Sequence, residues 1–250
     1  MKKALSPLVL VALAGSLGTA CSSAPTVSGT TQVQLARSAA LAKLSMSYTD
    51  VSQMPGTKVD ASGANVVETL RASLSASKAS QTLRFSNNQG NLDVIFVNGT
   101  IYVRTDANTL VYALGMPAST GPSWAGHWLA ISQSDTQFAE IAPTLTYESN
   151  LDPFLPTGIV TVKEHQQLHG TEVTALSGAA AKTGTVVSGS TTLYVSTATG
   201  LPVGATVQAI DKDKHTITEV VQFTSFGDPV DAVAPSDATP ISTAAHTTAP

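Results

Sequence analysis

The clearest pattern of hydrophobic and polar positions lies in residues 92–104, where two strand-like runs flank Asn98-Gly99. Asn-Gly is the dipeptide that a two-residue type I′ turn prefers, and β-branched and aromatic residues dominate both runs. A loop of this length fixes the register, so Asp93 is expected opposite Arg104. One face of the predicted hairpin is wholly apolar, and its residues are Val94, Phe96, Ile101 and Val103.

Two segments before the hairpin have apolar residues at helical spacing. The pattern over 33–44 predicts a weakly amphipathic helix, and a polar stretch follows it. Residues 65–79 give a stronger pattern, because Asn65 and Glu68 have the spacing of a capping box. The apolar stripe of this predicted helix, which we expect to pack against a sheet, is Val66, Val67, Leu70 and Leu74. A short strand with Leu83 and Phe85 on one side comes next.

After the hairpin, the pattern is that of short helices and then of strands. It predicts a short helix over 108–114, a strand over 127–131 and a helix over 134–145 that Pro143 interrupts. From residue 157 the chain alternates strand patterns with turns, up to a tail of Pro, Ala, Ser and Thr. This tail is expected to be disordered beyond residue 241. The absence of a strand–helix repeat argues against a parallel sheet and for an α+β fold with antiparallel strands.

The composition narrows the possible functions. The chain has 250 residues, only 12% of them charged, and a net charge of −4. Without a basic stripe to neutralise phosphates, nucleic-acid binding is not expected. The single cysteine, Cys21, cannot form an internal disulfide, so packing alone must hold the fold.

The N-terminus has the pattern of a signal peptide. Two lysines precede an apolar run that is too short for a comfortable membrane span, and small residues lead to Cys21. A cysteine in this position resembles the bacterial lipobox, although Gly18 stands where that motif usually has leucine. The resemblance implies a diacylated Cys21 as the first mature residue, with 22–31 as a flexible tether. The alternative is an ordinary secretory signal with an incidental cysteine, and both interpretations place the protein outside the cytoplasm.

The order of these features resembles the LppX/LprG-type lipoproteins of mycobacteria and their actinobacterial relatives, which share the fold of the lipoprotein carrier LolA. The resemblance covers about 64–238 and leaves 32–63 as an N-terminal extension without a counterpart. Its motifs are Cys21, the segment 65–79, residues 98–104, Trp128, residues 193–195, residues 200–203 and residues 223–235. It implies a strongly curved antiparallel sheet, a half-barrel wrapped around a few helices, with an apolar cavity between them.

The same resemblance implies a membrane-anchored protein that binds or moves acylated lipids, with no catalytic residues and no cofactor. The residues expected to line its cavity are Val66, Leu70, Leu74, Phe85, Val94, Phe96, Ile101 and Val103. Physical reasoning leaves a filled core open, because tight packing is the common outcome for globular domains. The alternative function is a non-catalytic envelope scaffold or sensor that binds a protein partner.

Three further patterns in the sequence are similar to known kinds of functional site. His165 and His169 are four residues apart, but their flanks indicate a strand and a turn, so no metal site is expected. Ser75-x-x-Lys78, Ser86-x-Asn88 and Lys182-Thr-Gly184 match motifs of penicillin-recognising enzymes, yet their spacing does not fit that fold. A carbohydrate platform of Trp124, His127 and Trp128 is less expected than tryptophans anchored in the core.

Overall fold

The computed structural model describes residues 27–53, 67–86, 90–182 and 186–249. The predicted signal peptide, Cys21 and Val66 lie outside the described residues. In the described part of the chain, no helix combines the length and hydropathy needed to cross a bilayer.

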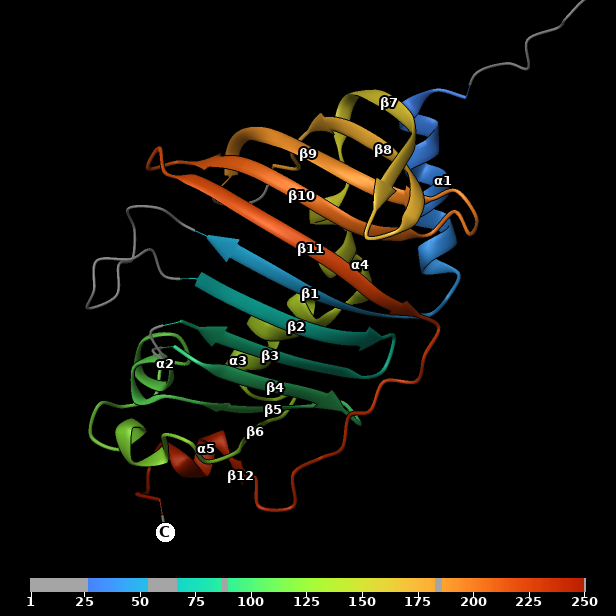
Figure 1. The fold of residues 1–250 in the computed structure, drawn as a ribbon. Helices are drawn as coiled ribbons and strands as arrows, with labels where there is room; N and C mark the ends of the chain where they lie inside the picture. Colours follow the sequence, from blue (N-terminus) through green and yellow to red (C-terminus); the bar gives the residue numbers. More distant parts are fainter. Residues whose placement is uncertain (1–26, 54–66, 87–89, 183–185, 250) are drawn as a thin grey trace, which may run out of the picture.

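The described residues form one twelve-stranded sheet with several helices (Figure 1). The strands are β1 (Ser45–Gln53), β2 (Val67–Ser75), β3 (Ala79–Phe85), β4 (Leu92–Val97), β5 (Thr100–Thr105), β6 (Leu129–Ile131), β7 (Thr157–Leu168), β8 (Thr171–Ala179), β9 (Val186–Ser196), β10 (Pro202–Asp211), β11 (Thr216–Phe226) and β12 (Thr239–Pro240). Their order is β12-β6-β5-β4-β3-β2-β1-β11-β10-β9-β8-β7. Every pair is antiparallel except β12 with β6, which confirms the predicted α+β class.

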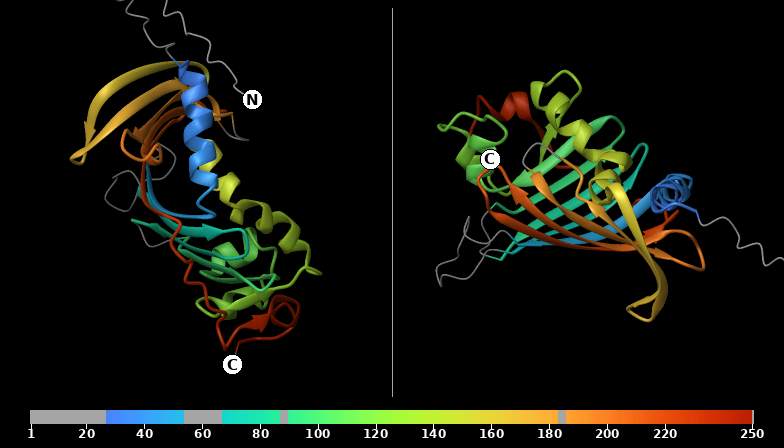
Figure 2. Two further views of the ribbon diagram at one scale, coloured as in Figure 1. Left: turned by 90° about the vertical axis from the view of Figure 1, so that its right-hand side faces the viewer. Right: turned by 90° about the horizontal axis from the view of Figure 1, so that it is seen from above.

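The helices gather mainly on one face of the curved sheet. The α-helices are α1 (Gly29–Leu41), α2 (Ala107–Tyr112), α3 (Thr136–Ile141), α4 (Tyr147–Leu151) and α5 (Ile241–Ala244), and the 3₁₀ turns are η1 (Gly121–Trp124), η2 (Ala142–Leu145) and η3 (Asp152–Phe154). Figure 2 shows α1, α4 and α3 in a row along this face, which we call the inner face. The core lies between these helices and the inner face, since Met46, Leu74, Ile101 and Leu151 are almost fully buried.

The central hairpin is confirmed in register and turn. Asp93 pairs with Arg104, and Val94 with Val103, as predicted. Asn98 and Gly99 have φ values of 54° and 73°, the left-handed conformation that a type I′ turn requires at both positions. The opposed charges form an ion pair with an N–O distance of 2.8 Å.

The helix predicted over 65–79 is wrong, because residues 67–75 form strand β2. Leu70 and Leu74 are four residues apart, a spacing that fits one face of a helix and also one face of a strand. The segment forms a strand because it pairs with β1 on one side and with β3 on the other. Residues 76–78 form the turn between β2 and β3, closed by a 2.8 Å bond from the Ser75 amide to the Lys78 carbonyl.

The described part of the predicted N-terminal extension, residues 32–53, belongs to this fold, because it carries most of α1 and all of β1. Strand β1 lies in the middle of the sheet, between β2 and β11. The helix predicted over 33–44 exists, but it begins earlier, at Gly29, so residues 29–31 of the expected tether are helical. Ser28 caps this helix by accepting a hydrogen bond from the Thr31 amide.

The expectation of disorder beyond residue 241 is also wrong. Strand β12 pairs with β6, and α5 follows it directly. Ile241 and Ala244 are buried, and the indole of Trp124 donates a 2.8 Å hydrogen bond to the Thr247 carbonyl. The small residues of this tail have low sequence hydrophobicity, but a few contacts with the sheet end hold it in place.

Candidate ligand-binding site

The described members of the predicted cavity set, which are all but Val66, share the inner face of the sheet. Phe96 pairs with Ala79, which pairs with Leu74, and directly opposed residues point to the same side of a sheet. The same argument places Leu70, Phe85, Val94, Ile101 and Val103 on this face. Leu74, Val94, Ile101 and Val103 belong to the packed core, so the protein's own side chains cover the apolar face of the hairpin.

Phe96 also lines an apolar pocket of about 300 Å³ at one end of the inner face. The pocket lies where the end of α1 meets the ends of β2 and β4 and the segment from η2 to α4. Its lining residues are Leu41, Leu44, Ser75, Ala76, Phe96, Ala142, Leu145, Thr146, Tyr147 and Glu148. Leu44 has a φ of 64° and is 73% exposed, so a large apolar side chain stands in solvent beside this pocket.

Hydrogen bonds hold the walls of the pocket in place. The hydroxyl of Tyr147 donates to the Ala40 carbonyl over 2.8 Å, which joins α4 to the last turn of α1. Phe96 meets Phe138 of α3 edge-to-face, with ring centroids 6.5 Å apart. The guanidinium of Arg37 in α1 makes two hydrogen bonds to the Asp152 carboxylate, at 2.7 and 3.0 Å. The pocket is therefore a preformed feature of the packed helix layer.

Asn150 connects the helix layer to the strands. Its Oδ1 atom accepts hydrogen bonds from the Tyr48 hydroxyl and the Gln81 amide, at 2.7 and 3.2 Å. Its Nδ2 atom donates to the carbonyls of Thr144 and Thr146, at 2.7 and 2.8 Å. One buried amide thereby fixes the segment that carries Leu145, Thr146 and Tyr147 against the sheet.

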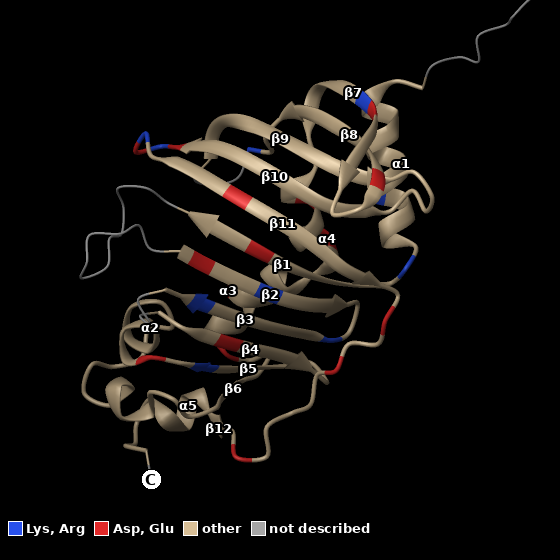
Figure 3. Ribbon diagram, viewed as in Figure 1, with Lys and Arg blue, Asp and Glu red and all other residues tan. Residues whose placement is uncertain are grey.

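A second polar feature of the inner face is a group of acidic residues toward the other end of the strands. Figure 3 shows acidic positions on the adjacent strands β11, β1 and β2, which carry Glu219, Asp50 and Glu68. Asp50 shares its face with Tyr48 two residues earlier, so it points toward the helix side. Burial, followed by the charges of Glu219 and Glu68, raises the pKa of Asp50 to about 8. Burial and Glu68 also raise the pKa of Glu219.

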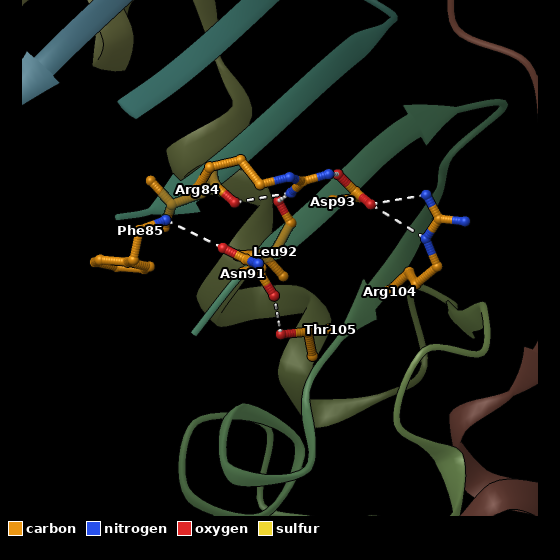
Figure 4. A network of polar contacts seen from close by, with 8 residues as sticks. Arg84, Phe85, Asn91, Leu92, Asp93, Arg104 and Thr105 are labelled. Carbon is orange, nitrogen blue, oxygen red and sulfur yellow. Dashed lines mark hydrogen bonds and ion pairs between the residues drawn. The ribbon is translucent and has the colours of Figure 1, made fainter. Parts of the chain in front are cut away.

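The face of the sheet opposite to the inner face, which we call the outer face, carries a network of two arginines around one carboxylate (Figure 4). Arg84 donates to one oxygen of Asp93 over 2.5 Å, and Arg104 donates twice to the other. Partial burial of Asp93 opposes ionisation, but the hydrogen bonds from both arginines outweigh it and hold its pKa below the usual value. The guanidinium of Arg104 also stacks over Trp128, 4.7 Å from the ring centroid. Both guanidinium groups therefore have partners within the protein. The network has a structural role, because it links the side chains of β3, β4 and β5.

The other candidate patterns have structural roles. Trp124 is buried against the C-terminal segment, as expected for a tryptophan anchored in the core. His165 pairs with Glu172 across the β7–β8 hairpin, and His169 lies in its turn. The Ser75 hydroxyl bonds to the backbone of Lys78 in the β2–β3 turn. Ser86 is the residue after β3, while Asn88 and most of the 182–184 motif lie outside the described residues.

Several pocket residues were not predicted from the sequence. Leu41 ends α1 and Leu44 follows it, whereas Leu145 and Tyr147 come from a segment about 100 residues later. Each has an ordinary local pattern, and their meeting depends on how the helices pack on the sheet. Leu41 and Leu44 belong to the apolar pattern that predicted the helix over 33–44, and this pattern alone does not distinguish a packing face from a pocket wall.

Solved structures resemble this fold. LprF from Mycobacterium bovis, a lipoprotein of the LppX/LprG type, matches with a TM-score of 0.45 and 11% identity, over 84% of this chain and 99% of LprF. A DUF1329 family protein from Desulfovibrio piger matches at 0.35 and 13%, over 83% and 96% of the two chains. A LolA superfamily protein from Nitrosomonas europaea matches at 0.29 and 9%, over 82% and 96%. No protein-family model and no curated protein matches the sequence.

Proposed function

We propose that this protein is an extracytoplasmic binding module, anchored to the cell membrane by an acylated Cys21, that takes an apolar ligand into the pocket beside Phe96. The observation that carries the proposal is the pocket itself. It is bounded by Leu41, Leu145 and Phe96 and is held open by the packed helices. A preformed apolar concavity with a few polar groups at its rim is typical of small-molecule sites.

The size of the pocket limits the ligand. A volume of about 300 Å³ is at the lower end of the range for ligand pockets. The pocket therefore fits one short chain or ring, and a lipid with several acyl chains would leave most of its apolar surface outside. The packed core under the hairpin supports the same limit, because Ile101 and Val103 already contact the protein's own side chains.

Occlusion of the pocket tests the ligand proposal. Ala76 is exposed and lines the pocket, so Ala76→Trp would fill it without disturbing the core. The matched control is Ala118→Trp, since Ala118 is also exposed and lies in a loop away from the pocket. Both changes are made in a chain with Cys21→Ser, which cannot be acylated, and native mass spectrometry measures bound apolar molecules directly.

We expect apolar adducts, or binding of added medium-chain fatty acids, in the parent chain and in Ala118→Trp. Ala76→Trp should lose at least about 90% of this binding, a tenfold loss of affinity. Equal binding by all three chains would place the ligand elsewhere. A sharp mass without adducts, together with no uptake of added fatty acid, would refute the ligand proposal.

The anchor is tested separately. We expect the wild-type chain in the membrane fraction, labelled by a fatty-acid analogue, because two or more acyl chains hold a protein firmly to a bilayer. Cys21→Ala should remove the label and release the chain from the membrane. An unlabelled wild-type chain would instead favour the ordinary secretory signal.

A further inference from the structure

The acidic group on the inner face contains polar atoms that the fold leaves without partners. The Oδ1 atom of Asp50 is buried and has no hydrogen-bond partner, and Asp50 as a whole is only 9% exposed. None of the described ion pairs includes Asp50 or Glu219. The hydroxyl of Thr191, a residue that is fully buried, also has no partner. Buried polar atoms in native proteins are nearly always bonded, so these exceptions need an explanation.

The strand register brings Asp50 and Glu219 together, whereas Thr191 lies two strands away from Glu219, on β9. Val207 pairs with Glu219 on one side and with Thr191 on the other, so all three point to the inner face in one row. Asp50 pairs with Val221, which makes Glu219 its diagonal neighbour on β11. Diagonal neighbours lie roughly 7 to 8 Å apart, which leaves room for a small group between the two carboxylates.

The two carboxylates have mainly aliphatic neighbours, although the buried Ser52 lies directly opposite Glu219 on β1. Asp50 has Leu70 and Val221 as its cross-strand partners, and both point to the inner face. Val207 separates Glu219 from Thr191 and is buried. A ligand that reached these carboxylates would therefore contact aliphatic side chains along its stem.

We infer that Asp50 and Glu219 form a binding site for the ammonium group of an alkylammonium ligand. A primary ammonium carries three donors and one positive charge. It would give Asp50 the missing partner and offset the repulsion between the two carboxylates. The site lies toward the opposite end of β2 from the Phe96 pocket, so the inference does not rest on the proposed function.

The spacing of the oxygen atoms favours an organic cation over a metal ion. A Ca²⁺ ion holds its oxygen ligands at about 2.3 to 2.6 Å, so their atoms lie within about 5 Å of one another. Among the described residues, Asp50, Glu68 and Glu219 do not form such a compact group. Asp211, Asp213 and His215 do, but Asp211 Oδ1 already accepts from the amides of Asp213 and His215 in a tight turn.

Isothermal titration of the intact chain carrying Cys21→Ser with octylammonium, against octan-1-ol as the neutral isostere, tests the site. A pH of about 8.5 is suitable, because the ligand amine is charged there and the Asp50 carboxyl, with its pKa of about 8, can ionise. Glu219 from β11, Glu68 from β2 and Tyr48 on β1 are the titratable groups that face Asp50. The variants are Asp50→Asn and Glu219→Gln, and the matched control is Glu140→Gln on the exposed side of α3.

We expect octylammonium to bind at least about tenfold more tightly than octan-1-ol, because hydrogen bonds between charged groups are the strong ones. Asp50→Asn and Glu219→Gln should each reduce this affinity about tenfold, while Glu140→Gln leaves it unchanged. Equal binding of the alcohol, no binding of octylammonium, or full binding by both variants would overturn the inference. Thermal unfolding of each variant shows whether it is folded. If Asp50→Asn does not fold, a folded Glu219→Gln variant is sufficient to test the site.

Discussion

Tyr48 on β1 donates a 2.7 Å hydrogen bond from its hydroxyl to the Oδ1 atom of Asn150 in α4, and both residues are buried. The bond joins the centre of the sheet to the helix layer that forms the pocket wall. Gln81 donates to the same oxygen, so Asn150 receives support from two strands.

We expect Asn150→Ala to destabilise the protein more than Tyr48→Phe does. The alanine leaves the Thr144 and Thr146 carbonyls and the Tyr48 hydroxyl without their partner, at a cost of about 3 kcal/mol or more. In Tyr48→Phe the Gln81 amide still bonds to Asn150, so the cost should be about 1 kcal/mol. Urea unfolding measures both, and equal effects would show that Asn150 does not act as a common partner.

The hairpin and the helix predicted over 65–79 show how far local patterns determine this fold. Asn98-Gly99 and the alternation beside it act within 13 residues, so the sequence alone predicted the register correctly. The conformation of β2 depends on its pairing with β1 and β3. The spacing of Leu70 and Leu74 fits both a helix and a strand, so the local sequence does not distinguish the two. The pocket is less predictable still, because Leu44 and Tyr147 meet through tertiary packing.

A substitution at Gly29, the first residue of α1, tests whether this helix packs against the sheet. A Cβ atom on Gly29 would lie 2.4 Å from the Val160 carbonyl oxygen of β7, a contact that backbone atoms cannot tolerate. Helix propensity alone favours alanine over glycine. We nevertheless expect Gly29→Ala to lower the free energy of unfolding by about 1 to 3 kcal/mol, because α1 must shift away from the sheet edge.

The control for this change is Leu35→Ala, since Leu35 in the same helix is 60% exposed. It should alter stability by no more than about 0.5 kcal/mol. If Gly29→Ala is as stable as the wild type in thermal unfolding, the close contact between α1 and β7 is absent in solution.

The C-terminal segment is expected to contribute to stability although its composition resembles a disordered tail. Removal of 239–250 takes Ile241 and Ala244 out of the core and leaves the Trp124 indole without its acceptor. The expected cost is roughly 3 to 5 kcal/mol, from the cavity and the unpaired donor together. Urea unfolding measures it, and Ser242→Ala, at an exposed position of α5, should have no effect. A truncated chain with wild-type stability would mean that the tail does not pack.

The raised pKa of Asp50 predicts an unusual dependence of stability on pH. The ordinary pKa of 3.8 applies to the unfolded chain, whereas burial and the charges of Glu219 and Glu68 raise the folded value to about 8. Between these values the folded state holds a proton that the unfolded state has lost, so this group lowers stability as pH rises. One such group changes the free energy of unfolding by at most about 1.4 kcal/mol per pH unit.

Asp50→Asn removes this contribution because the amide does not titrate. We expect the variant to gain stability relative to the wild type on going from pH 5 to pH 7.5, by up to about 3 kcal/mol in urea unfolding. Asp93, whose pKa is lowered, contributes in the opposite direction, but it is present in both chains and cancels in the comparison. A difference between variant and wild type that stays constant with pH would mean that Asp50 is ionised throughout, held by a partner in the native protein.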